Sequence, residues 1–266
     1  MIRSIRAELV KLTRRRFLLV TTLVTTIFAV GATAIVVMAA ESVPVGGPRS
    51  GIDQLLSVEA LGAAGGGTAV FAQTAAFGAV FLLAVFIATV AGELSRGTFR
   101  TMLLQQPHRG RVLAGKMIAV IGFAVVVSLY AEVVAWITAR LIAPGQGIDT
   151  TRWTSLDALG AAGEDFGRLV LFIAGWAVIA TVVGVLARSV PVGVGVGLVW
   201  AGPVENVIGD GWSPGERFFP GLVLRSIISP AAATVSFERA VITMSVYGAI
   251  AAAITAVALS RRDVTS

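Results

Sequence analysis

Long apolar runs, separated by short islands in which the charges are crowded, dominate this sequence of 266 residues. Hydrophobic residues make up 56% of the chain and charged residues only 14%. Most runs are about 20 residues long, the length that a helix needs to cross the hydrocarbon core of a bilayer. A β-barrel would instead show short alternating segments. The runs therefore predict an all-α polytopic membrane protein, since only helices or closed barrels satisfy the backbone in lipid.

Six spans in a single transmembrane domain are expected, at about residues 17–40, 70–92, 112–139, 169–187, 190–204 and 240–260. The first run is too long for the core of a signal peptide, so we expect it to be retained. Only Arg188 and Ser189 separate spans 4 and 5, which must then be antiparallel neighbours.

Residues 1–16, ahead of the first span, have the pattern of a helix lying in the membrane interface. Apolar residues share one helical face and basic residues the other: Ile2, Ile5, Leu9 and Leu12 against Arg3, Arg6, Lys11 and Arg14. This predicts an amphipathic helix that enters the membrane surface without crossing it.

The distribution of Lys and Arg predicts the orientation of the chain. Six lie in the N-terminal tail, five between spans 2 and 3, one between spans 4 and 5, and two in the C-terminal tail. On the other side there are one, three and three, and the longer two of these islands also hold acids. Both termini and the segment between spans 2 and 3 are therefore expected on the cytoplasmic side. The net charge of +6 is explained by anionic lipid and this rule, so we expect no binding of nucleic acid.

Residues 93–116, between spans 2 and 3, form a charged segment between two apolar runs, which we call the charged hinge. Ser95 and Thr98 can cap a short helix, and Pro107 ends it. Phe99, Met102, Leu103 and Gln106 follow the i, i+3, i+4, i+7 spacing of one helical face. This pattern predicts an amphipathic helix that contacts a partner. A solvated basic loop that only fixes topology is the alternative.

Two further features of the hinge bear on chemistry. Glu93 ends span 2, where the helix dipole disfavours an anion, so we expect a cationic partner: Arg96, Arg100, Lys116 or a base on another protein. The run from Gly110 to Met117 resembles a phosphate-binding loop but places Met where a hydroxyl must reach magnesium, and no strand precedes it. A tight turn with an interface-anchoring Lys116 is the better interpretation, and the chain is expected not to bind ATP.

Enzyme and metal sites are not predicted. His108 is the single histidine and cysteine is absent, which excludes disulfides, thiolate sites and Ser-His-Asp triads within the membrane. No metal ligand, catalytic residue or bound cofactor is therefore expected in this chain.

Three features of the spans themselves stand out. Glu132 is the one carboxylate predicted deep in a span; it either faces a substrate path or is neutral and hydrogen-bonded to a neighbouring helix. Gly193 and Gly197 form a small-x-x-x-small pair for close packing, within the chain or between protomers. The segment from Trp212 to Pro230 is too apolar for a free loop and too broken for a span. It predicts a re-entrant or interfacial helical pair on the outer side, or an ordinary outer amphipathic helix.

These features together resemble the permease subunits of bacterial ABC exporters of the ABC-2 type. The resemblance rests on the basic N-terminal helix, the Glu93-x-x-x-Gly97-Thr98-x-Arg100 run with Pro107-x-Arg109 and Gly115-Lys116, the Arg188-Ser189 turn, and the Trp212–Pro230 segment. It covers nearly the whole chain.

What the resemblance implies is a half-transporter in the bacterial cytoplasmic membrane. Two permease copies, identical or related, would form the translocation path, and each would dock a soluble ATPase subunit that binds ATP and Mg²⁺. The helix from Thr98 to Gln106 would be the coupling helix that enters the ATPase. The implied coupling residues are Glu93, Arg96, Gly97, Thr98, Phe99, Arg100, Met102, Leu103, Pro107 and Arg109.

The family's cargoes range over drugs, peptides, polysaccharides and lipids, and charge-poor spans favour an amphiphilic or hydrophobic one. Two other classes of protein remain open. A proton-coupled secondary transporter would use Glu132 and need no ATPase. A noncatalytic membrane scaffold would bind a partner through the charged hinge without transport.

Overall fold

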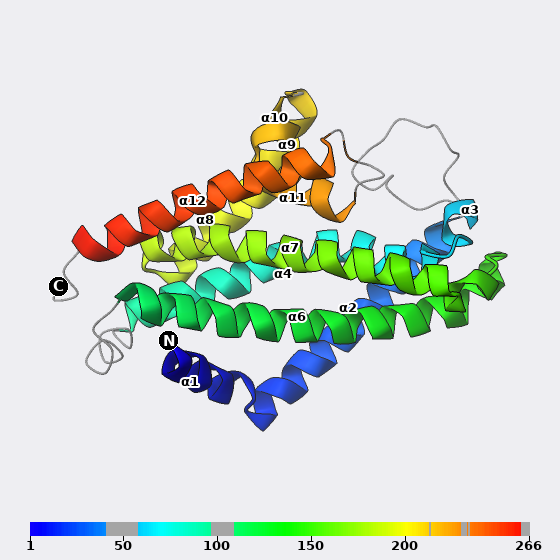
Figure 1. The fold of residues 1–266 in the computed structure, drawn as a ribbon, viewed down its shortest axis with the longest axis horizontal. Coiled ribbons are helices and arrows are strands. Elements are labelled where there is room, and N and C mark those ends of the chain that lie inside the picture. The colour runs from blue at the N-terminus through cyan, green and yellow to red at the C-terminus, as the bar shows by residue number, and fades with distance from the viewer. Residues whose placement is uncertain (41–57, 97–108, 213, 230–232, 234, 262–266) are drawn as a thin grey trace. The chain divides into compact units, whose positions relative to one another are not determined.

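The computed structural model describes the chain except for residues 41–57, 97–108, 213, 230–232, 234 and 262–266. Helices make up nearly all of the described part, and Figure 1 traces them from α1 to α12. They are α1 (Ile2–Leu12), α2 (Arg15–Ala39), α3 (Val58–Leu61), α4 (Gly66–Ser95), α6 (Arg109–Ile142), η2 (Ala143–Gln146), η3 (Thr151–Thr154), α7 (Leu156–Ala187), α8 (Val190–Val199), η4 (Trp200–Val204), α9 (Glu205–Gly211), α10 (Gly215–Phe218), α11 (Pro220–Ile228) and α12 (Phe237–Arg261).

Six segments of the described chain are long and apolar enough to cross a membrane, and each overlaps a predicted span, although the fourth begins at Leu156, well before the predicted start at residue 169. They are Arg15–Ala39, Gly78–Ser95, Gly110–Gln146, Leu156–Ala187, Val190–Gly209 and Phe237–Ala258. Large apolar side chains are exposed along them, as at Ile242, Val246 and Ile250 on one face of α12. Such a surface is stable against lipid and unstable in water, which confirms a multi-pass, all-α membrane protein.

The N-terminal segment divides as its sequence pattern predicts. Helix α1 ends at Leu12, Arg14 adopts an extended conformation with φ −61° and ψ 132°, and α2 begins at Arg15. The extended residue separates the amphipathic helix from the first span, so each can take its own direction.

The turn between the fourth and fifth spans is as tight as predicted. Helix α7 ends at Ala187 and α8 begins at Val190, with Pro191 in its first turn. Arg188 makes the reversal with a positive φ of 49°. A left-handed residue other than glycine costs roughly 1–2 kcal/mol, which the packing of α7 and α8 must offset.

The fifth span is longer than the sequence predicted. We expected its end near Val204 because Gly202 and Pro203 break helices, but the helix continues through the π-helical turn η4 into α9. Proline cannot donate a backbone hydrogen bond, and a wider turn accommodates the loss. The Asn206 side chain supports this turn by donating to the carbonyl oxygen of Gly202 at 2.7 Å.

Short helices fill the segment before the last span, as the Trp212–Pro230 pattern predicted. Helix α11 buries Leu222, Val223, Leu224, Ile227 and Ile228 and packs against α12. Their depth in the membrane stays a prediction.

The described helices form two compact units. Unit 1 comprises Met1–Leu12, Gly78–Phe123 and Leu171–Ser266, and unit 2 comprises Thr13–Phe77 and Ala124–Val170. Helices α4, α6 and α7 contribute to both. That the two units act as one transmembrane domain stays a prediction.

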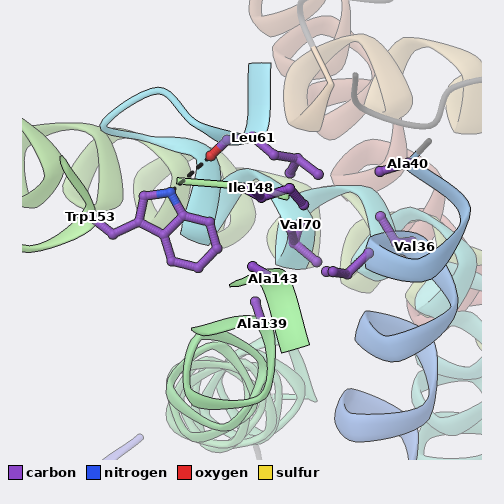
Figure 2. Close-up of a cluster of buried hydrophobic side chains, with 9 residues drawn as sticks. Val36, Ala40, Leu61, Val70, Ala139, Ala143, Ile148 and Trp153 are labelled. Carbon is purple, nitrogen blue, oxygen red and sulfur yellow. Dashed lines mark hydrogen bonds between the residues drawn. The ribbon is translucent and has the colours of Figure 1, made fainter. Parts of the chain in front are cut away.

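Unit 2 has its apolar core where α2, α3, α4, the end of α6 and the following turns meet (Figure 2). Its members are Val36, Val37, Ala40, Leu61, Val70, Ala139, Ala143, Ile148 and Trp153. The Trp153 indole nitrogen donates to the carbonyl oxygen of Leu61 at 2.8 Å, which satisfies both groups inside the core.

Candidate functional site: an ion-pair ring at the charged hinge

The candidate site lies in unit 1, where α4 ends and α6 begins on either side of residues 97–108. A small apolar cluster holds these helix ends together. Its buried members are Val90, Val112, Leu113 and Val185, with Leu94, Met117 and Ala258 packed against them. This apolar cluster, called the rigid base below, therefore packs the ends of α4, α6 and α7 together. The charged side chains next to it lie on these packed helix ends.

Glu93, in the last turn of α4, has two cationic partners. The Lys116 ammonium nitrogen, Nζ, lies 2.8 Å from Glu93 Oε1, and Lys11 Nζ lies 2.9 Å from the same oxygen. Lys116 was one of the partners that the sequence predicted. Lys11, on α1, was not expected, because it is 82 residues away in the chain.

Glu8, also on α1, closes the arrangement into a ring. Its Oε1 lies 2.9 Å from Lys116 Nζ, and its Oε2 lies 2.9 Å from Lys11 Nζ. The ion-pair ring is therefore Glu8, Lys11, Glu93 and Lys116, in which each carboxylate touches both ammonium groups. Its formal charge is zero, so no net charge is buried where α1 meets the two helices.

The ring is largely inaccessible to water. Lys116 is only 4% exposed and Glu8 only 6%, whereas the Lys11 side chain is 43% exposed. Buried charges are costly unless paired, so each buried member depends on the others. Lys11 forms the solvent-accessible side of the ring.

Titration of the two α1 residues reflects these contacts. Burial by itself raises the pKa of Glu8, but hydrogen bonds and charge from Lys116 and Lys11 outweigh it, and the pKa falls below its usual value. Burial by itself lowers the pKa of Lys11, but Glu93 and Glu8 outweigh it, and this pKa rises. Both groups are thus held in their charged forms across the neutral range.

Close backbone packing accompanies the ring. A β-carbon built on Gly115 would lie 3.0 Å from the Met1 carbonyl oxygen and 3.0 Å from Ser4 Cβ. Any side chain at position 115 would therefore push α1 away from α6. The predicted tight turn at Gly110–Lys116 is wrong: both glycines lie within α6, and Gly115 is needed for the approach of another helix rather than for a turn.

The structure covers only part of the predicted coupling residues. Glu93 is in the ring, Arg96 is exposed just beyond α4, and Arg109 begins α6. The others lie outside the described residues: Gly97, Thr98, Phe99, Arg100, Met102, Leu103 and Pro107. The coupling helix therefore stays a prediction, while the two helix ends that flank it are defined.

Glu8 and Lys11 are the site residues that sequence reasoning missed. The available signal was their i, i+3 spacing and the position of a single acid within a strongly basic N-terminal segment. Glu8 reduces the positive charge of this basic helix, and the sequence alone gives no reason for it. The structure supplies the reason, because Glu8 pairs with the buried Lys116.

Gly193 and Gly197 pack within the chain. Both are buried on the side of α8 that meets α4, where added β-carbons would lie 2.8 Å from Ile87 Cγ2 and 2.6 Å from Ile87 Cδ1. Gly195, between them, has no atom within 4 Å of an added β-carbon. Their role is thus helix packing in one chain, and a role between protomers stays a prediction.

A second buried acid lies farther along unit 1. Glu205, expected in an outer loop, is instead inside the longer fifth span and 1% exposed. The Trp200 indole nitrogen donates to its Oε1 at 2.6 Å, and the carboxylate lies beside Gly221 at the start of α11. A β-carbon at Gly221 would lie 2.2 Å from Glu205 Oε2, so a larger residue there would displace the carboxylate. Glu205 is therefore buried where the fifth span meets the start of α11.

Comparisons with family models, with curated proteins and with solved structures find no significant match to this chain.

Proposed function

We propose that this chain is the transmembrane permease subunit of an ATP-driven exporter of the ABC-2 type. In this proposal the chain has no nucleotide site of its own and docks a separate ATPase. Two copies of the chain, or one copy and a related chain, line the path in the bacterial cytoplasmic membrane.

The observation that supports the proposal best is the ion-pair ring beside residues 97–108. A loop that only joins two spans needs no further contacts to hold the helix ends on either side of it. Here the end of α4, the start of α6 and the interfacial helix α1 are joined by four ionic contacts between 2.8 and 2.9 Å. Buried ionic networks contribute little net stability compared with apolar packing. Their specific geometry is useful where several elements must move as one body.

The proposed mechanism follows from this fastening. A push or pull on residues 97–108 by an ATPase passes directly into α4 and α6, because both helices end at the rigid base. The ring makes α1 move with them instead of staying behind in the membrane surface. ATP binding and hydrolysis on the partner would then alternate the bundle between two arrangements. The charge-poor spans favour an amphiphilic or hydrophobic cargo.

The experiment is a mild-detergent purification of the tagged chain from its native membrane, with an ATPase assay on the proteins that accompany it. A soluble ATPase of the P-loop type should co-purify. The variant R96E/R100E should release it, and so should F99A/M102A, because they remove the charge and the apolar face of the predicted coupling helix.

The matched control is R152E/R239E. Both arginines are exposed and lie on segments predicted to face the opposite side of the membrane. This variant should retain the ATPase. A chain that purifies without any ATPase, or release that is equal in the control, would overturn the proposed function.

A further inference from the structure

Three helices of unit 2 bring two acids to the same level. Thr68 on α4 donates from its hydroxyl to Asp165 Oδ2 on α7 at 2.7 Å. The residue before it, Gly67, packs against Trp136 on α6, where an added β-carbon would lie 2.8 Å from Trp136 Cδ1. Glu132 lies one helical turn before Trp136, on the same face of α6. The charge of Asp165 accordingly acts on Glu132.

Glu132 is buried without a compensating base. It is 7% exposed, and it forms no hydrogen bond or ion pair with any residue that the structure describes. Arg140, on the same helix, stacks over Trp136 at 5.3 Å from the ring centroid, two helical turns from Glu132, or about 12 Å along the axis. Arg168 forms an ion pair with Glu164, one turn from its own position on α7, and its charge also acts on Asp165.

Among the described elements around the two acids, η3 contributes Arg152, whose side chain is exposed. Residues 66–77 of α4 and 17–39 of α2 contain no charged residue, and the charged residues that α7 contributes to unit 2 are Asp157, Glu164, Asp165 and Arg168. Two ionised carboxylates in such surroundings repel each other, and burial further disfavours the charged form of each. A single proton removes that repulsion.

We propose that Glu132 and Asp165 form a proton-binding site within the membrane-spanning helices, at which the two carboxyl groups together hold one proton. Their environments divide the roles. Asp165 accepts a hydrogen bond from Thr68, which stabilises its ionised form, whereas Glu132 has no such donor and holds the proton. The site is independent of the proposed function, since it requires neither an ATPase nor residues 97–108.

The test is covalent labelling of the full-length chain in liposomes with dicyclohexylcarbodiimide, an apolar reagent that adds to protonated carboxylic acids. Labelled residues are identified by mass spectrometry of peptides at about pH 7. Glu132 should carry most of the label. Glu93, held by two ammonium groups, should carry almost none, and E238Q, at an exposed acid far along the chain, should leave the Glu132 label unchanged.

Two variants separate a shared proton from a carboxyl that burial alone keeps neutral. In D165N the like charge is gone, so the label on Glu132 should fall several-fold. In T68V Asp165 loses its hydrogen-bond donor, so part of the label should move from Glu132 to Asp165 while the total stays constant. The proposal would be overturned if Glu132 were unlabelled in the wild type. It would also be overturned if D165N did not lower the amount of label on Glu132, or if T68V did not move label from Glu132 to Asp165.

Discussion

The ion-pair ring makes a quantitative prediction for Lys116→Met. This change keeps the length of the side chain and removes its charge, leaving Glu8 and Glu93 with Lys11 as their one partner in the ring. Lys11 is 43% exposed, so it can only partly compensate the second carboxylate. Breaking a buried ion pair by removing one partner costs about 3–5 kcal/mol, and we expect the low end of that range here.

A double-mutant cycle with Glu8 identifies the source of this cost. The variant E8M/K116M removes one acid and one base together, and the Lys11–Glu93 pair at 2.9 Å remains neutral. Replacement of both partners by apolar groups of similar shape is close to neutral. The double variant should therefore be more stable than the sum of the two single variants predicts, by about 3 kcal/mol, at the upper end of the coupling measured between residues in contact.

Hydrogen exchange at the amides of α1, measured by mass spectrometry on the chain in detergent, gives the free energy of local opening. K116M should lower it most, E8M less, and E8M/K116M least. The control is K11M, which removes the half-exposed member of the ring and should cost about 1 kcal/mol or less. If the costs of K116M and E8M are simply additive, the two side chains do not act as a ring and the reasoning fails.

Three further predictions concern packing and pH. Gly115→Leu should displace α1 and speed its hydrogen exchange, whereas Gly122→Leu, on the same helix with nothing within 4 Å, should not; equal effects would contradict the close approach. Because the pKa of Glu8 is depressed, its stabilisation of α1 is fully present above its ordinary value of 4.5 and is lost as the pH falls through the depressed value. Exchange of α1 in E8M should lack this acid-side change, and an identical pH profile would refute the assignment. Gly197→Ala should lower the thermal unfolding temperature, at a cost of about 1–3 kcal/mol from the clash with α4, whereas Gly195→Ala should leave it equal or higher because alanine favours helix. The opposite order would place the packing face of α8 on the other side.

The sequence determined the class of the protein because lipid imposes a local requirement. Every span must satisfy its own backbone, so about 20 apolar residues suffice to locate it, and all six predicted spans were found. The break after α1 and the Arg188–Ser189 turn could also be predicted from the sequence, since each follows from charges or turn residues a few positions apart.

The ends of the helices within the membrane were harder to predict from the sequence. Gly202 and Pro203 predicted the end of the fifth span, yet the helix continues through a π-helical turn supported by Asn206. A local breaker signal was overridden there by contacts that form only after the helix has packed. The same extension moved Glu205 from an expected loop into the buried interior.

The ion-pair ring shows most clearly the division between sequence and tertiary structure. The sequence determined that Glu93 needs a cation, because a carboxylate at the end of a helix is disfavoured wherever the helix lies. It left three residues of this chain as candidates for that cation. Only the packing of α1 against α6 at Gly115 decided that Lys116 and Lys11 share the role and that Glu8 closes the ring. Pairing over long sequence separations depends on which helices meet, and helices in lipid meet through shape, which the pattern of charges along one chain does not encode.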